Sequence, residues 1–385
     1  MQNFIYDIPT KIFFGQGQIK ELGTLVLNYG SRVLLVYGGG SIKKNGIYDA
    51  VCAQLNEQHL FFTELSGVEP NPRIDTVRKG VTISQKENVD VIVAIGGGST
   101  VDCAKVIAAS VHYEGDPWDI VKNGRLAKDT LPIIAIPTLA ATGSEMDTFA
   151  VISNPETRDK IGTGHSSMRP VAAILDPTYT YTVNAYHTAA GTADIMSHIL
   201  ECYFSNAQGF LQDRMAEALL KTCIRYGKEA IEKPDSYEAR ANLQWASCWA
   251  INNLLELGKS VAWSVHPMEH ELSAYYDITH GVGLAILTPH WMEYVLDENS
   301  VEKFKEYGIN VWDIDASLPA MDIARLSIQK TKEYFEELSI PMHLKEVGID
   351  ETYFDIMAQK ASASMKFAYR PLTPADIVKI FKASL

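Results

Sequence analysis

The feature that most constrains how this chain can fold is a repeat of short apolar runs, each ending in a turn of small residues. Val33–Tyr37 and Val89–Ile95 each run into three glycines, and Leu131–Pro137 runs into Thr138. Between them lie segments such as Ile74–Glu87, with apolar residues at helical spacing. Strand, turn and helix in rotation are typical of a parallel sheet with helices on both faces. The first half of the chain is therefore predicted to be an α/β domain.

After about Tyr186 the pattern changes to long segments with helical periodicity. These segments are Thr192–Phe204, Arg214–Ile231, Tyr237–Leu257 and Asp322–Leu338. The apolar run Val282–Leu287 fits a strand or a buried helix, and periodicity leaves both open. A chain of 385 residues is long enough for two domains. We expect a parallel-sheet domain over residues 1–183 and an all-helical domain over residues 184–385.

The charge and the cysteines narrow the class of protein. A net charge of −13 argues against a nucleic-acid partner, whose phosphates it would repel. The five cysteines are scattered with no Cys-x-x-Cys pair, which fits a reducing compartment and speaks against thiolate metal sites. The N-terminus shows no secretory signal, and no apolar stretch reaches the roughly 18–20 residues that span a bilayer. We expect a cytoplasmic enzyme with no membrane partner.

The second glycine turn has features of a phosphate-binding loop. Gly97, Gly98 and Ser99 stand between an apolar strand and a helix expected over Thr100–Ser110. Glycine lets backbone N–H groups approach a pyrophosphate, and a helix N-terminus adds partial positive charge. Ser99 is the expected N-cap of this helix, and Asp102 falls in its first turn. The motif is not the G-x-G-x-x-G fingerprint, so a capped turn without a ligand explains it as well.

Two further turns strengthen the case for a ligand. Thr138–Glu145 crowds small hydroxyl residues, among them Thr142 and Ser144, directly after an apolar strand. Glu69–Pro72, which contains Asn71, is a rigid turn before another helix. Each is explained by turn chemistry when taken alone. Because ligands of open parallel sheets gather at the carboxyl ends of the strands, three such turns favour a phosphate-bearing ligand.

A cluster of histidines and one aspartate suggests a metal. Asp194 and His198 are four residues apart, so a helix would present both on one face. His266, His270 and His280 fall within fifteen residues, in a chain with only ten histidines. A single Asp–His pair at this spacing is more often a hydrogen-bonded surface pair, and that alternative stays open. One carboxylate with neutral imidazoles suits Zn²⁺ or Fe²⁺.

The chemistry of such a site would suit an alcohol. A divalent ion held by Asp194, His198 and two later histidines would leave a net charge near +1. That charge is well placed to stabilise an alkoxide, the form that an alcohol takes before it gives up a hydride. A nicotinamide dinucleotide would accept the hydride. If the cluster holds such an ion, its chemistry therefore suits the oxidation of an alcohol and the reverse reduction of an aldehyde.

Together these motifs resemble the iron-type (group III) alcohol dehydrogenases, and in particular their butanol dehydrogenase-like branch. The resemblance runs along essentially the whole chain. It rests on Gly96–Ser99 with Asp102 and Lys105, Pro70–Pro72, Pro137–Glu145, Lys160, Asp176 and Pro177, Thr188–Glu201, His266–Gly281, and Pro289 and His290. It implies a dehydroquinate synthase-like fold, with a dinucleotide-binding α/β domain, an all-helical domain and an active site in the cleft between them. It also implies a homodimer.

The resemblance implies roles for individual residues. The four metal ligands of the family correspond to Asp194, His198, His266 and His280. His270 corresponds to a family histidine that sits near the nicotinamide and relays a proton. The alternative for His270 is a helix-face histidine that only supports His266. The residues expected to bind the cofactor are Gly38, Gly39, Gly40, Ser41, Lys43, Asn71, Gly97, Gly98, Ser99, Asp102, Thr138, Thr142, Ser144 and Lys160.

For the dinucleotide we expect NADP(H) over NAD(H). NAD-binding sheets usually carry an acidic residue at the end of an early strand, and its charge would repel a 2′-phosphate. Gly38 stands where NAD-using members of the resembled family carry aspartate. Ser41 can donate a hydroxyl, and Lys43 or Lys44 can supply positive charge. If Gly38–Gly40 forms only a flexible turn, both dinucleotides are used.

The substrate is predicted to be a small primary alcohol or aldehyde, similar to butanol or butanal. Residues near the proposed ligands are apolar, among them Ile195, Met196, Trp263 and Met268. A lyase or synthase on the same architecture, such as a dehydroquinate synthase-like enzyme, would need basic residues there to hold an anionic substrate. A non-catalytic cofactor-binding protein is the third interpretation, and the complete set of four ligands argues against it.

Overall fold

A computed structural model describes residues 1–207 and 209–385 and divides the chain into two compact units. The sheet unit comprises residues 7–183 and 234–248, and the helical unit comprises residues 1–6, 184–233 and 249–385. The predicted domains differ from these units at residues 1–6 and 234–248. Within the helical unit, the N-terminal segment is tied down by a hydrogen bond from the Gln2 N–H to the Gly258 carbonyl, 2.9 Å long. As functional domains, residues 1–183 and 184–385 stay a prediction.

The sheet unit is built on six parallel strands. In chain order these are β1 (Lys11–Phe14), β2 (Arg32–Tyr37), β3 (Phe61–Leu65), β4 (Val91–Gly96), β5 (Ile133–Pro137) and β8 (Ala172–Leu175). They lie side by side in the order β1-β8-β5-β4-β2-β3, and β6 (Phe149–Asn154) and β7 (Asp159–Gly164) form a separate antiparallel pair. The predicted α/β class with a parallel sheet is confirmed.

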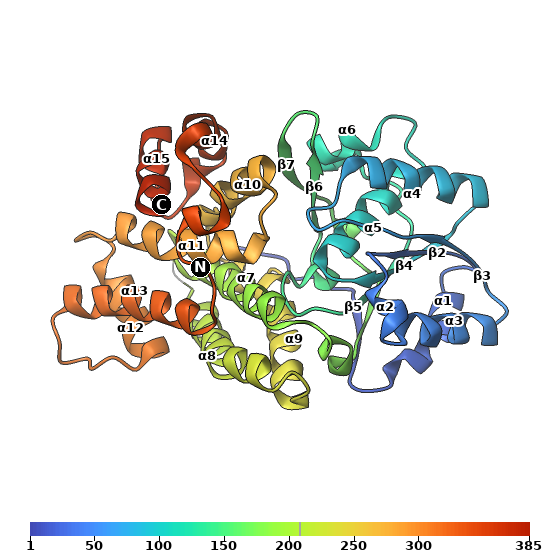
Figure 1. Cartoon of the computed structure of the whole chain (residues 1–385), viewed down its shortest axis with the longest axis horizontal. Helices are drawn as coiled ribbons and strands as arrows, with labels where there is room; N and C mark the ends of the chain where they lie inside the picture. Colours follow the sequence, from blue (N-terminus) through green and yellow to red (C-terminus); the bar gives the residue numbers. More distant parts are fainter. Residues whose placement is uncertain (208) are drawn as a thin grey trace. The chain divides into compact units, whose positions relative to one another are not determined.

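Helices cover both faces of this sheet (Figure 1). One face packs against α1 (Leu22–Leu27), α2 (Ser41–Lys44) and α3 (Ile47–Glu57). The other packs against α4 (Ile74–Glu87), α5 (Gly98–Ser110) and α6 (Pro117–Lys122). Alternate residues of β4 enter opposite cores, with Val93 on one side and Ile92 on the other. Because both faces are buried, the strands read as continuous apolar runs in the sequence.

Three of the turns that carry predicted cofactor residues, those after β2, β4 and β5, follow neighbouring strands. β2, β4 and β5 are adjacent and parallel, with Tyr37 opposite Ile95 and Gly96 opposite Pro137. A hydrogen bond of 2.9 Å from the Thr138 N–H to the Gly96 carbonyl extends the last pairing beyond the strands. The turns that leave these strands therefore emerge at one edge of the sheet, where open parallel sheets bind their ligands.

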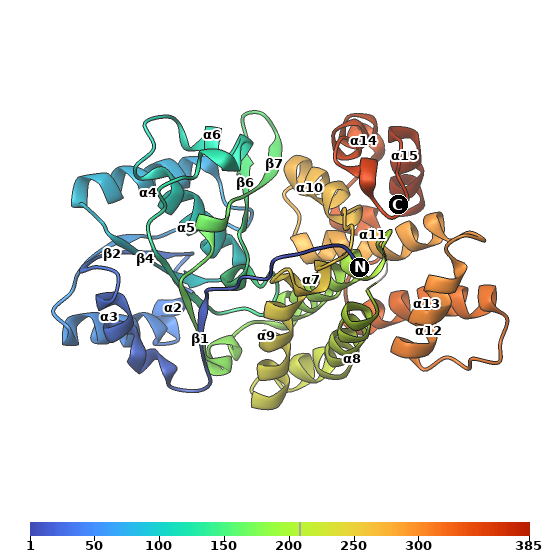
Figure 2. The ribbon, with the colours of Figure 1, turned by 180° about the vertical axis from the view of Figure 1, so that it is seen from behind.

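The helical unit is a bundle of long helices (Figure 2). It contains α7 (Ala185–Tyr203), α8 (Phe210–Glu232), α10 (Val265–Tyr276), α11 (His280–Val295), α12 (Val301–Trp312), α13 (Ala320–Glu337), α14 (Phe354–Ser362) and α15 (Pro374–Ala383). Helix α9 (Tyr237–Ile251) lies mostly in the sheet unit. The run Val282–Leu287 is a fully buried part of α11, so the helical alternative holds. Among the residues described, no helix is long and apolar enough to cross a membrane.

Candidate active site

Helix α7 presents the first two predicted metal ligands. It begins after Asn184, whose side chain accepts a hydrogen bond of 2.8 Å from the His187 N–H and so caps the helix. From Thr188 to Tyr203 every residue of α7 is buried. Asp194 and His198, one turn apart, are each only 3% exposed. A carboxylate and an imidazole held this far from water need partners there.

Two further histidines come from α10 and α11. His266 lies in the first turn of α10, and His280 is the first residue of α11. The connection between these helices is short because Asp277 adopts a left-handed conformation, with φ of 51°, and reverses the chain. Aspartate tolerates this region better than most residues. The tight connection returns His280 to the neighbourhood of His266, with ring centres 5.3 Å apart.

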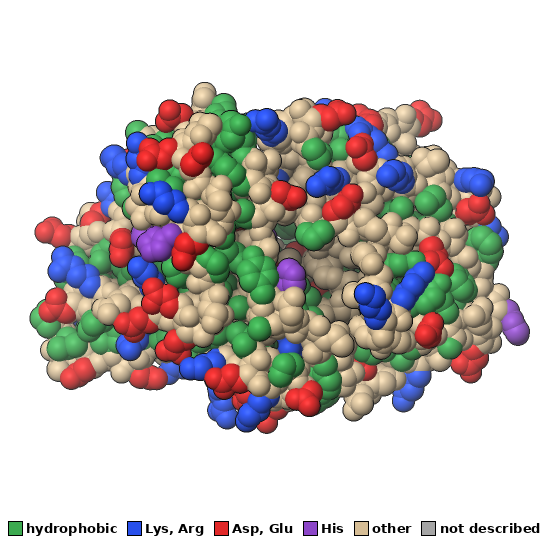
Figure 3. All heavy atoms as spheres, viewed as in Figure 1, with side chains coloured by type: hydrophobic (Ala, Val, Ile, Leu, Met, Phe, Trp, Pro, Cys, Tyr) green, Lys and Arg blue, Asp and Glu red, His purple; other side chains and the backbone are tan. Residues whose placement is uncertain are grey.

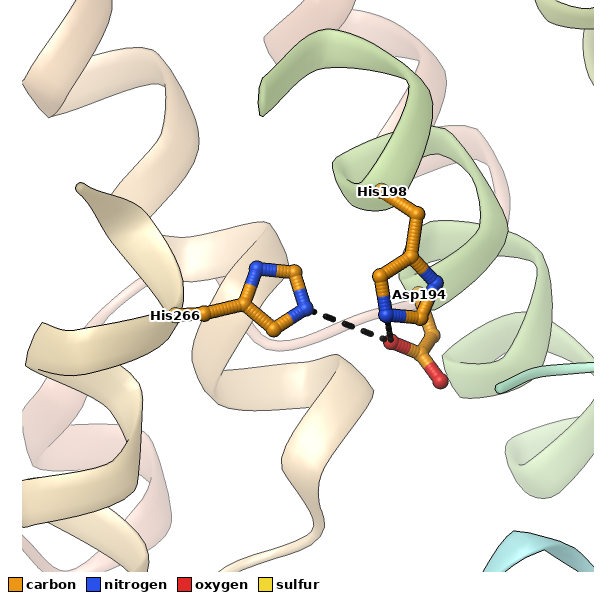
Figure 4. Close-up of side chains that lie close together, drawn as sticks. All are labelled: Asp194, His198 and His266. Atoms are coloured by element: carbon orange, nitrogen blue, oxygen red, sulfur yellow. Dashed lines mark ion pairs between the residues drawn. The ribbon is translucent and has the colours of Figure 1, made fainter. Parts of the chain in front are cut away.

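The four side chains converge on one carboxylate oxygen. Asp194 Oδ1 lies 3.7 Å from His198 Nε2, 3.9 Å from His266 Nε2 and 3.7 Å from His280 Nε2. Figure 4 shows the imidazoles of His198 and His266 directed at Asp194 from different helices. These separations exceed hydrogen-bond lengths. They approach the separation of about 3.4 Å between two ligands of one tetrahedral zinc ion.

The electrostatics of the cluster suit a cation. Burial lowers the pKa of His198 well below its usual value of 6.5, and the neighbouring His266 lowers it further. The imidazole is therefore neutral, as a metal ligand must be. The His198 ring is stacked on that of His266 with centres 4.7 Å apart, and Trp263 lies against both. One carboxylate oxygen and three imidazole nitrogens form a donor set that fits Zn²⁺ or Fe²⁺.

Two buried glutamates to which the sequence analysis gave no role contact these histidines. Glu201 accepts a hydrogen bond of 3.1 Å at Oε1 from His266 Nδ1, and Glu269 pairs with His280 Nδ1. Both carboxylates have a signal in the sequence. Glu201 is three residues after His198 on α7, and Glu269 is three residues after His266 on α10, so each shares a helix face with a proposed ligand.

His270 lies at the border of the cluster. It is half-buried on α10, with its ring centre 6.3 Å from that of His266 and 5.6 Å from that of His280. It also belongs, with Glu269 and His280, to a second group of side chains close enough to share an ion. The structure brings His270 to the proposed ligands, and its role as a proton relay stays a prediction.

In the sheet unit, the helix that follows β4 begins two residues earlier than predicted. Helix α5 begins at Gly98 with Gly97 as its N-cap, so the prediction of Ser99 as the N-cap is wrong. The Gly97 carbonyl accepts from the Thr100 N–H at 3.0 Å, which closes the first helical turn. A side chain at Gly98 would overlap with Thr142 of the next loop. The glycine therefore allows the two predicted cofactor loops to pack against each other.

Asp102 and Ser144 hold these loops together. Ser144 donates a hydrogen bond of 2.6 Å to Asp102 Oδ1, and the Val151 N–H donates one of 2.9 Å to Asp102 Oδ2. The buried Lys105 in turn donates to Ser144 at 2.8 Å. Burial raises the pKa of Asp102, while Lys105 and Lys160 oppose that shift. The side chains of Asp102 and Ser144 are thus engaged within the fold, and their binding of the cofactor stays a prediction.

The turn after β2 is open. Gly40 has a φ of 97°, a left-handed conformation that favours glycine, and Ser41 begins α2. A side chain at Gly39 would meet no atom within 4 Å, and one at Gly38 would meet only the Val68 carbonyl at 3.4 Å. β2 therefore ends without a carboxylate and with open space around the turn. Binding of the adenosine ribose at this turn stays a prediction.

A glutamate on the neighbouring strand changes the surroundings of Lys43. Glu64, on β3, lies 3.5 Å from Lys43 Nζ and accepts hydrogen bonds from the hydroxyls of Tyr37 and Tyr48. The sequence analysis missed Glu64 because only the sheet brings β3 beside β2. The ammonium expected to attract a 2′-phosphate is therefore already paired, though both side chains of this ion pair are partly exposed.

The other predicted cofactor residues lie at the same edge or near it. Asn71, in the turn after β3, has a φ of 52° and immediately precedes Pro72. Thr138 directly follows β5, and Lys160 lies on β7, where it is buried. The structure thus brings the loops after β2, β4 and β5 to one edge, with the turn after β3 beside them.

Comparison with protein families decides what these two regions belong to. Residues 9–177 match the model of iron-containing alcohol dehydrogenases, and residues 188–385 match that of the C-terminal region of Fe-containing alcohol dehydrogenases. The chain is a member of the iron-containing alcohol dehydrogenase family. It is a nicotinamide-dependent oxidoreductase, and the resemblance to the butanol dehydrogenase-like branch is confirmed.

Individual members of the family show the same relationship. This dehydrogenase is 59% identical over 388 residues to NADH-dependent butanol dehydrogenase A of Clostridium acetobutylicum, with 100% of both chains covered. It is 36% identical to the NADPH-dependent aldehyde reductase YqhD of Escherichia coli, over 94% of this chain and 93% of that one. The crystal structure of NADH-dependent butanol dehydrogenase A from Thermotoga maritima superposes with a TM-score of 0.95 at 36% identity, covering 100% and 99% of the chains.

Proposed function

We propose that this iron-type dehydrogenase transfers a hydride between NADP(H) and a small primary alcohol or aldehyde at a divalent metal held by Asp194, His198, His266 and His280. The observation that carries the proposal is the convergence of three imidazole nitrogens on one carboxylate oxygen at 3.7–3.9 Å. When bound, such an ion supplies Lewis-acid stabilisation of negative charge on the substrate oxygen. The hydride chemistry belongs to the nicotinamide.

The chain's own residues hold the groups and move the proton. Trp263 lies against His198 and His266, with ring centres 5.5 and 4.4 Å away, and shields one side of the pair. His270, near His280, is the proposed relay for the hydroxyl proton of the alcohol. General acid–base groups contribute about 10²–10⁴-fold to rates. His270→Gln should therefore lower kcat by about a hundredfold while metal content stays unchanged, and an unchanged kcat would leave His270 a supporting residue.

The apolar neighbours of the proposed ligands support a small uncharged substrate. Ile195, Met196 and Met268 are fully buried beside them, and relatives are named as butanol dehydrogenases and an aldehyde reductase. Each buried methylene contributes about 0.8 kcal/mol at most. We expect kcat/KM to rise modestly from acetaldehyde to butanal. A strong preference for phosphorylated or carboxylated aldehydes would contradict the proposal.

The preference for NADP(H) rests on the turn after β2. Gly38 carries no carboxylate, and the space around Gly39 leaves room for a 2′-phosphate. The pairing of Lys43 with Glu64 opposes this preference, and the names of the relatives include both NADH- and NADPH-dependent enzymes. A ratio of kcat/KM for NADPH over NADH of about ten corresponds to about 1.4 kcal/mol. Wild-type enzyme that prefers NADH would refute this part of the proposal.

The metal is tested by removal and return. Dialysis against a chelator should abolish aldehyde reduction, and Fe²⁺ or Zn²⁺ should restore it. Comparison of the two ions at equal occupancy decides which one supports turnover. Full activity in protein that contains no metal by elemental analysis would contradict the proposal.

We also propose that the enzyme works in the cytoplasm as a homodimer. β1 is an edge strand of the sheet, a position open to pairing with a second copy. Phe14, at its end, is 37% exposed and packs against the equally exposed Trp245. Basic side chains are scattered among acidic ones on the face in Figure 3, an arrangement that does not favour a nucleic-acid partner. A monomeric mass by light scattering at assay concentrations would contradict the dimer.

A further inference from the structure

Two of the three histidines in the proposed metal site are anchored through the ring nitrogen that faces away from Asp194. His266 Nδ1 lies 3.1 Å from Glu201 Oε1, and His280 Nδ1 is paired with Glu269 Oε2. An Nδ1–H that donates to a carboxylate leaves the lone pair on Nε2. In both residues Nε2 is the atom directed at Asp194, so each carboxylate selects the tautomer that can bind an ion.

Glu201 also fixes the start of the helix that carries His266. Its carboxylate accepts hydrogen bonds from the N–H groups of Ser264 at 2.7 Å and of Val265 and His266 at 2.8 Å. These bonds satisfy the free N–H groups at the N-terminus of α10, where a negative charge is favourable. Since Glu201 lies on α7 with Asp194, it fixes the first turn of α10 relative to the helix that supplies the first two ligands.

Glu269 makes the corresponding link from α10 to α11. It is fully buried, and besides His280 it receives a hydrogen bond from the Ser273 hydroxyl one turn along its own helix. Gly283 makes room for it, since a side chain there would come within 2.8 Å of Glu269 Cγ. The first turn of α11, which holds His280, is thereby fixed to α10.

His198 provides the contrast within the same site. Its Nδ1 is buried and has no hydrogen-bond partner among the described residues, and its ring is held by stacking on His266 instead. It needs no second carboxylate because it shares α7 with Asp194, and the helix itself sets their spacing. The carboxylates thus occur where ligands must be brought from other helices.

We propose that Glu201 and Glu269 are positioning residues, which hold His266 and His280 in the tautomer and place that the metal requires before the ion binds. The inference rests on the proposed metal site and adds the residues that build it. Carboxylates in this position typically change metal affinity by 10- to 100-fold. Their loss should therefore weaken metal binding without removing any ligand.

The test uses Co²⁺, whose visible absorption reports the number and geometry of its ligands, on the full-length protein. Glu201→Gln and Glu269→Gln are compared with wild type by competition with a chelator. Glu217→Gln is the control, because Glu217 is a buried carboxylate of the helical unit that has no described contact with any of the proposed ligands. It pairs with Arg214 at 2.5 Å and accepts from Tyr203 at 2.8 Å and Asn310 at 3.0 Å. We expect Co²⁺ affinity to fall 10- to 100-fold in the first two variants, with an altered spectrum. The control should match wild type in both.

The outcomes separate this inference from the function on which it rests. Folded Glu201→Gln and Glu269→Gln proteins with wild-type affinity and spectrum would overturn the positioning role while leaving the metal site intact. Wild-type protein that binds no Co²⁺ would refute the metal site itself, and the inference with it. Glu201 caps α10, so the folding of its variant is checked by circular dichroism. If Glu201→Gln is unfolded, Glu269→Gln, which leaves that cap intact, decides the question.

Discussion

The sheet unit and the helical unit assemble their functional groups in different ways. At the edge of the sheet, the turns after β2, β4 and β5 are brought together by strand pairing, and glycines at 38–40 and 97–98 expose the backbone. In the helical unit, the proposed metal ligands are side chains from α7, α10 and α11 that meet in a largely buried cluster. The proposed cofactor site is therefore built mainly from backbone, and the proposed metal site from side chains.

This difference determines what each region tolerates. A site built from backbone groups requires that the ligand, or a neighbouring loop, come close to the backbone. An added Cβ therefore damages it, whereas a change in a more distant side chain has little effect. A side-chain metal site loses its function when a single ligand is removed, although the surrounding helices persist. The following variants test this contrast, from the largest expected effect to the smallest.

Removal of one imidazole should have the largest effect. His280→Ala deletes a proposed ligand that is 23% exposed, so the bundle should stay folded. Because Lewis-acid stabilisation is worth several kcal/mol, kcat/KM for butanal should fall by about a thousandfold or more. His187→Ala, an exposed histidine in the first turn of α7, is the control and should keep wild-type activity. Turnover of His280→Ala near the wild-type rate would contradict the assignment of His280 as a metal ligand.

Addition of one methyl group should damage the backbone site next. Gly98→Ala places a Cβ where Thr142 lies, so the two loops must separate. Overpacking typically costs about 1–3 kcal/mol, which corresponds to about a 5- to 150-fold weaker affinity for NADPH by fluorescence titration. Metal content should not change. Gly162→Ala is the control, because the added Cβ meets Val151 at an ordinary 3.9 Å, and it should bind NADPH as wild type does. Equal NADPH affinity in both variants would contradict the assignment of the loop after β4 to the cofactor site.

A carboxylate at the end of β2 should shift the choice of dinucleotide. Gly38→Asp adds a negative charge where only the Val68 carbonyl is near, at 3.4 Å. We expect the ratio of kcat/KM for NADPH over NADH to fall about tenfold, mainly through weaker NADPH binding, because a carboxylate repels a 2′-phosphate. An unchanged ratio would mean that this turn does not contact the adenosine ribose.

The smallest effect is expected at Glu64. Glu64→Gln removes the charge that pairs with Lys43 at 3.5 Å, in an ion pair that is partly exposed and therefore weak. The freed ammonium should strengthen NADPH binding by no more than about threefold, because exposed ion pairs are weak, with NADH binding unaltered. Equal gains for both dinucleotides would show that Lys43 does not distinguish the 2′-phosphate.

The same contrast explains what the sequence could predict. The strands and their turns follow from local patterns, and β2, β4 and β5 lie within two residues of the predicted ranges. The prediction of Ser99 as an N-cap is wrong because the glycines let the helix start two residues earlier, and a local hydroxyl carries no sign of that. The α/β class and the family were therefore accessible from the sequence alone.

The residues that the sequence missed depend on contacts between distant elements. Glu64 acquires its meaning from the pairing of β3 with β2, and Glu201 from a helix that begins more than sixty residues later. Glu269 is closer to its partner, eleven residues before His280, but the turn at Asp277 must first reverse the chain. The spacing along each helix places Glu201 and Glu269 on the face of a proposed ligand. Which histidine each of them contacts is set by tertiary packing.

Four side chains of the helical unit are proposed to share one metal ion. Anomalous X-ray diffraction, recorded on both sides of the iron and zinc absorption edges from crystals of fully active enzyme, tests this proposal directly. We expect one peak about 2.0–2.2 Å from a carboxylate oxygen of Asp194 and from the Nε2 atoms of His198, His266 and His280. Active crystals without a peak there, or with the metal held by other residues, would contradict the account.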